Sequence, residues 1–101
     1  MYSNISSINA HSTWMNASAN NVANANTNKF TPTDTIINSG DNNSPKATLR
    51  NSSSAGTENS SGTNLAKEMT DQIVISDSTA LNVSAIKTED SMTKTLLDIK
   101  A

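Results

Sequence analysis

Two stretches with helical spacing of apolar residues, one near each end of the sequence, flank a middle that offers almost nothing for a core. The first stretch runs from Met1 to about Asn26, and the second runs from Leu65 to Ile99. The residues between them are mainly Ser, Thr, Asn and Gly. Such a chain has to cover its helices with each other or with something larger, so we expect a protein that donates helices to an assembly.

Composition narrows the choice of function. The sequence has 101 residues, of which 34% are hydrophobic, so we expect one small domain of marginal independent stability that folds on assembly. A net charge of −2 without a basic stripe argues against a nucleic-acid partner. The sequence has no cysteine, and its one histidine, His11, has no nearby carboxylate in sequence. We therefore expect no metal, no cofactor and no enzymatic activity.

The first residues, MYSNISSINAHSTWMN, combine neither a basic leader nor a continuous apolar run. We therefore expect no cleavable secretion signal, and no run of the sequence is long enough to predict membrane insertion.

The first stretch has apolar residues at alternating three- and four-residue spacing, which places them along one face of a helix. They are Met1, Ile5, Ile8, Met15, Ala19 and Val22. Asn and Ser flank this face, and inside a helix they are unfavourable unless their side chains find partners. We therefore predict hydrogen bonds that cross between close-packed helices. The segment ends at Phe30, Thr31 and Pro32, because the residue before a proline favours extended geometry.

The middle of the sequence contains two short strand-compatible runs, DTIIN at 34–38 and KATLR at 46–50. Asn42, Asn43, Ser44 and Pro45 lie between the two runs as turn residues, which would allow a short hairpin. Residues 51–63 have the composition of a flexible linker, and we expect them to be mobile unless a neighbour holds them.

The second stretch begins with Asn64, a favourable N-cap residue, and has Glu68 in its first turns. Its length exceeds what the first helix can cover, so the surplus has to pack on other chains. The run from Ile75 to Asn82 is polar and β-branched, which predicts a weak point near Ser76–Thr79. Residues that can share one broad face are Met69, Ile73, Ala80, Val83, Met92, Leu96 and Ile99.

These patterns predict an all-α fold, in which antiparallel N- and C-terminal helices form a coiled-coil hairpin with a short loop or β-hairpin insert. The predicted segments are the N-terminal helix at 1–30, the loop at 31–63 and the C-terminal helix at 64–101. The predicted function resides in an interface, and Trp14 is included because large amphipathic rings often anchor subunit contacts. The interface residues are Ile5, Ile8, Trp14, Met15, Val22, Phe30, Met69, Ile73, Val83, Ile86, Met92, Leu96 and Leu97.

The string SSINAHSTWMNASANNVANANTNKF, from Ser6 to Phe30, resembles the N-terminal motif of the bacterial flagellar rod, hook and hook-associated axial proteins. In that family a helix ends in a run similar to ANNVANANT. The strings NLAKEMTDQIV and LNVSAIKTEDSMTKTLLDIK resemble the terminal helix of the same family. The short middle is most similar to that of a small proximal rod protein or a divergent short paralogue.

The resemblance implies a structural subunit whose terminal helices pair into a coiled coil, many copies of which stack into a helical tube. It implies export by the flagellar type III apparatus and a place in the periplasmic rod of the basal body. The implied partners are copies of the chain, other rod proteins and the export apparatus, with no nucleic acid and no membrane insertion.

Two positions depart from the family pattern. Lys29 stands before Phe30 where the family usually has glycine, which argues against a tight left-handed turn there. Residues Ser76–Thr79 replace a Gln-Arg-x-aromatic stretch. The alternative function is therefore an accessory helical adaptor, which binds an export or basal-body component without being an axial subunit.

Overall fold

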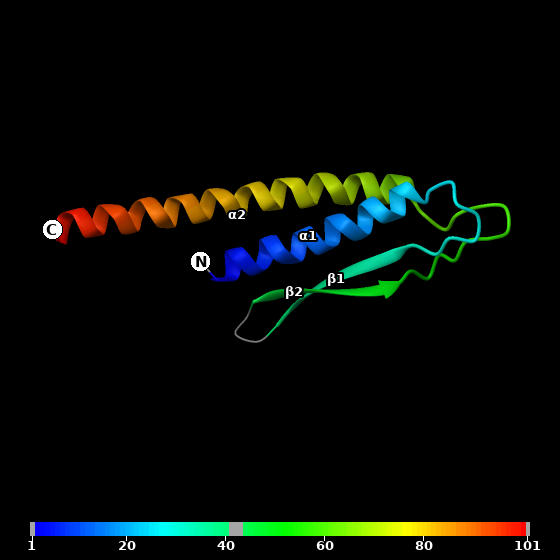
Figure 1. The fold of residues 1–101 in the computed structure, drawn as a ribbon, viewed down its shortest axis with the longest axis horizontal. Coiled ribbons are helices and arrows are strands. Elements are labelled where there is room, and N and C mark those ends of the chain that lie inside the picture. The colour runs from blue at the N-terminus through cyan, green and yellow to red at the C-terminus, as the bar shows by residue number, and fades with distance from the viewer. Residues whose placement is uncertain (1, 41–43, 101) are drawn as a thin grey trace.

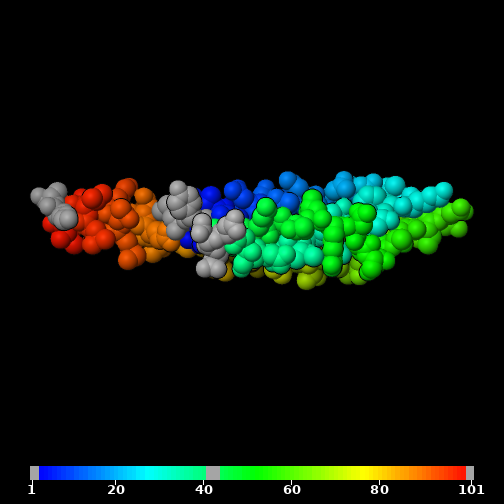
Figure 2. Space-filling view, turned by 90° about the horizontal axis from the view of Figure 1, so that it is seen from below, coloured from blue at the N-terminus to red at the C-terminus, as the bar shows by residue number. Residues whose placement is uncertain are grey.

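The protein is elongated, with principal dimensions of 68 × 25 × 13 Å. The structure, a computed structural model, describes residues 2–40 and 44–100. Its elements in chain order are α1 (Tyr2–Ala23), β1 (Thr33–Ser39), β2 (Pro45–Asn51) and α2 (Leu65–Lys100). Helix α1 is the central element, since α2 runs along one side of it and the β1–β2 hairpin lies on the other side (Figure 1). Figure 2 shows the C-terminal part of α2 projecting beyond the rest of the molecule.

The prediction of an all-α fold is wrong, because β1 and β2 form an antiparallel two-stranded sheet. The register runs from Thr33 opposite Asn51 to Ser39 opposite Pro45. A two-stranded ribbon is marginally stable alone in water, and here both strands pack against α1. Of the residues discussed above, Met1 and the predicted turn residues Asn42 and Asn43 lie outside the described ranges.

Helix α1 ends at Ala23, before the predicted end of the segment at residue 30. The Asn24 side chain closes this end, because its Nδ2 donates to the Asn20 carbonyl oxygen at 2.8 Å. The chain then turns at Lys29, whose φ of 66° lies in the left-handed region. The substitution of lysine for glycine has therefore not removed the left-handed turn, and the expectation drawn from that departure is wrong.

The segment with linker composition is held by the residues that follow α1. The Gly62 and Ser52 amides donate to the carbonyl oxygens of Phe30 and Pro32, both at 2.8 Å, and the Lys29 amide donates to the Thr57 carbonyl at 2.7 Å. The backbones approach so closely that a Cβ at Gly56 would lie 2.5 Å from the Phe30 carbonyl oxygen. The turn after α1 is therefore the neighbour that holds this segment in place.

Helix α2 is continuous from Leu65 to Lys100, so the predicted weak point near Ser76–Thr79 is wrong. Packing of Ile75, which is 2% exposed, overrides the low helix propensity of this stretch. The predicted N-cap is confirmed, since the Lys67 amide donates to Asn64 Oδ1 at 3.2 Å.

Candidate interaction surface

Helices α1 and α2 pack along a seam that is mostly polar. On α2 the seam residues alternate at spacings of four and three, and each is buried or half-buried. They are Glu68, Gln72, Ile75, Thr79, Asn82, Ile86 and Glu89. Few apolar side chains are buried within the described residues, namely Ala10, Pro32 and Ile75, whereas Ser18, Asn21 and Glu68 are buried polar residues.

The best-connected part of the seam is the polar junction of Ser18, Asn21 and Glu68. The Ser18 hydroxyl donates to Glu68 Oε2 at 2.8 Å, and Asn21 Nδ2 donates to Glu68 Oε1 at 2.9 Å. Gln72 Nε2 in turn donates to Ser18 Oγ at 3.2 Å. A buried carboxylate is tolerated only when such donors satisfy it. The predicted hydrogen bonds between close-packed helices are thereby confirmed.

Asn21 also joins the helices to the sheet. Its Nδ2 donates to the Thr33 carbonyl oxygen at 2.8 Å, and its Oδ1 accepts from the Thr33 amide at 2.9 Å. The Thr63 hydroxyl donates to the Asn21 backbone carbonyl at 3.1 Å. One residue of α1 therefore fixes the start of β1, the approach to α2 and α2 itself. Asn21 lies in the ANNVANANT run that carries the N-terminal resemblance.

The seam extends to the other end of α1, where Asn4 Nδ2 donates to Glu89 Oε1 at 3.2 Å. Because α1 begins at Tyr2, the part of α2 that follows Glu89 continues past α1, and no other helix of the described residues lies beside it (Figure 1). This overhang spans about ten residues, or roughly 15 Å of helix.

Lys67 sits between three carboxylates at the start of α2. Partial burial lowers the pKa of Lys67, but a 3.0 Å hydrogen bond to Asp71 and the charges of Asp71, Glu68 and Asp34 outweigh it, so the pKa is raised above its ordinary value. The Asp34 carboxylate belongs to β1 and lies 3.8 Å from the Lys67 amine. Lys67 therefore adds a second, more exposed link between α2 and the hairpin.

The apolar residues of the helices are largely outside the seam. Of the predicted interface residues, seven are exposed and six are half-buried. The exposed ones are Ile5, Met69, Ile73, Val83, Met92, Leu96 and Leu97, and the half-buried ones are Ile8, Trp14, Met15, Val22, Phe30 and Ile86. Sequence reasoning did not select Ile75 or Glu68 for the seam. The four-three spacing of the seam could have found them, had polar residues been counted as well as apolar ones.

Part of the predicted interface comes together in a groove between the two helices. Met15 of α1 lies beside Met69 and Ile73 of α2, with Gln72, Ser76 and Asp77 completing that part of the lining. The groove continues toward the N-terminus of α1, where Ile8 and Met15 face Ile75. Two residues of α1 and two of α2 from the predicted set therefore share one apolar surface.

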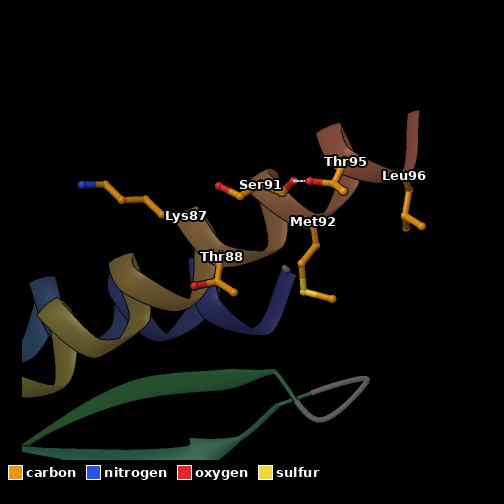
Figure 3. Close-up of a pocket in the computed structure, with 6 residues that line it drawn as sticks. All are labelled: Lys87, Thr88, Ser91, Met92, Thr95 and Leu96. Carbon is orange, nitrogen blue, oxygen red and sulfur yellow. Dashed lines mark hydrogen bonds between the residues drawn. The ribbon is translucent and has the colours of Figure 1, made fainter. Parts of the chain in front are cut away.

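A separate hollow lies on the C-terminal part of α2. Figure 3 shows Met92 and Leu96 pointing to one side of the helix, the side on which the hairpin lies, while the Lys87 amine extends elsewhere. Its lining consists of Lys87, Thr88, Ser91, Met92, Thr95 and Leu96.

Among the described residues there is no cluster of three or more His, Cys, Asp or Glu side chains that could hold a metal ion. None of the described helices is both long and apolar enough to span a bilayer.

Paired helices with a hydrogen-bonded polar seam and apolar outer faces are features of a structural protein that acts through contact surfaces. Residues 54–99, a little under half of the chain, match the family model described as flagellar basal body rod FlgEFG protein C-terminal. This match supports membership of the flagellar basal-body rod family. A search of curated proteins finds no match.

The matched family, which is structural and not enzymatic, supports a rod-associated structural role at the flagellar basal body. The matched residues comprise the loop that packs on the turn after α1 and nearly all of α2.

Proposed function

We propose that the chain is a structural subunit of the basal-body rod. It assembles through α1 and α2 with copies of itself and with other rod proteins into a helical tube, after export by the flagellar type III apparatus. The distribution of apolar residues on the helices supports this function.

That distribution is the reverse of what an independent globular domain has. The surface between α1 and α2 is mostly polar, whereas large aliphatic side chains such as Ile73, Leu81 and Leu96 are exposed. Burying one such side chain fully contributes about 1.5–3 kcal/mol. A subunit with several of them gains far more from assembly than its own small core supplies.

The small core also fits export of an unfolded chain. Among the described residues only Ala10, Pro32 and Ile75 are buried apolar side chains, and the polar junction contributes only modest net stability because its groups exchange one set of hydrogen bonds for another. A rod subunit has to leave the cytoplasm before it assembles in the periplasm, and low stability of the single chain makes passage through a narrow channel easier.

The experiment compares two charge substitutions, Ile8→Glu and Leu96→Glu, with two controls. Lys94→Glu adds a carboxylate near Leu96 but on the opposite side of α2, and Asn9→Glu adds one next to Ile8, beside Lys46 of the hairpin. The readout is the amount of each variant in isolated basal bodies relative to its amount in cells, with helicity checked by circular dichroism. We expect both substitutions at apolar positions to reduce incorporation at least tenfold and both controls to be incorporated normally.

Normal incorporation of Ile8→Glu and Leu96→Glu would contradict the proposal. If instead the chain is absent from basal bodies and binds an export component through one helix alone, the adaptor function replaces the axial one.

A further inference from the structure

Resting on the proposed function, we propose that neighbouring copies contact each other head to tail through two different faces of α2. The first stripe consists of Leu65, Met69, Ile73, Ser76, Ala80 and Val83. The second stripe consists of Leu81, Ala85, Thr88, Met92, Leu96 and Ile99. The first stripe of one copy packs against the second stripe of the next.

The two stripes have matching spacing. Leu81 follows Leu65 by 16 residues, and Ile99 follows Val83 by the same number. When the first stripe is aligned with the second in this way, their residues form six pairs. Four of these pairs, including the two at the ends, join two apolar residues. The other two pairs place Ser76 near Met92 and Ile73 near Thr88. A parallel neighbour displaced by 16 residues, about 24 Å along the helix, therefore brings the stripes into register over their full length.

The stripes lie on opposite flanks of the seam. At about 100° per residue, the centre of each stripe lies roughly 100–115° from the centre of the seam around α2, with one stripe on either side of the seam. The first stripe borders the groove between the helices, where Met69 and Ile73 lie beside Met15 of α1. The second stripe is on the hairpin side, where Figure 3 shows Met92 and Leu96. One copy can thus contact two neighbours at once.

The charges on α2 mark where each stripe stops. Along the flank of the first stripe, the positions after Val83 are Lys87, Asp90 and Lys94. Along the flank of the second stripe, the early positions are Lys67 and Asp71, which pair with each other at 3.0 Å. Both stripes themselves are free of charge, so each is matched to a partner surface that is also apolar and uncharged.

The occupant is a second copy because one repeated contact then covers both stripes on every molecule. A two-fold contact between identical stripes would cover one stripe and leave the other exposed. A contact between unlike surfaces is heterologous and propagates into a ring or an open helical array. This is the symmetry that a tube requires, and the structure supplies its two halves on one helix.

The absence of cysteine from the sequence makes a cross-linking test direct. The double variant Ala80→Cys/Leu96→Cys places one thiol on each stripe, about 24 Å apart on the same helix, so any disulfide between them has to join two molecules. We expect mild oxidation of basal bodies containing this variant to produce a ladder of dimers, trimers and higher multimers. Each single variant should give no cross-link.

The matched control is Ala80→Cys/Leu97→Cys. Leu96 and Leu97 are similarly exposed, at 65% and 62%, but their side chains point about 100° apart around α2. This control should give no ladder. A second pair, Met69→Cys/Ala85→Cys, tests the same register independently and should reproduce the ladder if the first pair disturbs packing.

The outcomes separate the two proposals. Incorporation of the cysteine variants without a ladder from either pair overturns the head-to-tail contact while leaving the rod function intact. A dimer from a single variant overturns it in favour of a two-fold contact. If the cysteine-free chain itself is absent from basal bodies, the proposed function fails and this contact fails with it.

Discussion

Asn21 and Glu68 are 47 residues apart in sequence, yet Asn21 Nδ2 donates to Glu68 Oε1 at 2.9 Å and both side chains are buried. The same Asn21 side chain also donates to the Thr33 carbonyl oxygen and accepts from the Thr33 amide. A single side chain therefore determines how α1, β1 and α2 meet, and the stability of the isolated chain should depend on it more than on any aliphatic residue of similar size.

Asn21→Ala should lower the free energy of unfolding by about 2–3 kcal/mol, because it leaves the Glu68 carboxylate short of a donor and the Thr33 amide without its acceptor. Urea unfolding followed by circular dichroism measures this change, with trimethylamine N-oxide added to strengthen burial in a marginal fold. Asn20→Ala is the control: Asn20 is exposed, so its loss should change stability by less than about 0.5 kcal/mol. Equal effects of the two substitutions would contradict the role given to Asn21.

Lys29→Gly should stabilise the protein by about 0.5–1 kcal/mol. A lysine in the left-handed region costs about 1–2 kcal/mol relative to glycine, and the greater freedom of glycine in the unfolded chain offsets part of the gain. Asn28→Gly, one residue earlier and without a positive φ, should instead destabilise. Thermal midpoints of the two variants give the comparison, and a loss of stability with Lys29→Gly would show that the turn is not held as described.

Gly62→Ala should lower the free energy of unfolding by about 2–3 kcal/mol, because the added methyl group meets the Ser54 carbonyl oxygen and nearby backbone. This backbone cannot move aside without disturbing the packing of the loop on the turn after α1. Gly40→Ala is the milder counterpart, since its Cβ would lie 3.0 Å from the Ser44 carbonyl oxygen. Limited proteolysis between residues 52 and 63 should be accelerated only in Gly62→Ala. Protection of this loop in both variants would argue that it does not pack on the turn after α1.

Lys67 should make stability depend on pH only at alkaline values. Because its pKa is raised in the folded state, its contribution is fully present below the unfolded pKa of about 10.4 and is lost as the pH rises through the higher folded pKa. Its side chain is half exposed, so screening limits the contribution to a few tenths of a kcal/mol. The difference in urea midpoint between wild type and Lys67→Met should therefore be small at pH 7 and should shrink further as the pH rises through the folded-state pKa. A difference that grows with pH would contradict this sign.

Local signals in the sequence predicted the parts of the fold that local chemistry determines. Asn64 predicted the start of α2, and the polar residues of the first segment predicted hydrogen bonds between helices. The two strand-compatible runs, DTIIN and KATLR, lie within β1 and β2, but the sheet was given too little weight in an all-α prediction. Its stability depends on packing against α1, which short-range patterns do not encode.

The seam was harder to predict than the elements. Counting apolar residues selected Met69 and Ile73 for α2, whereas the face that contacts α1 is centred on Ile75 and includes Glu68. The usual expectation that apolar residues lie inside assumes that the chain folds alone. Here the larger apolar faces of α2 are exposed. Selecting apolar residues therefore identified the exposed faces and missed much of the contact between α1 and α2.

The most direct test of the central claim is cryo-electron microscopy of basal bodies isolated from cells that make this chain. We expect density in the rod for paired helices corresponding to residues 2–23 and 65–100, with the apolar stripes of α2 covered by neighbouring subunits. A chain that is helical and monomeric in solution and absent from the rod density would contradict it.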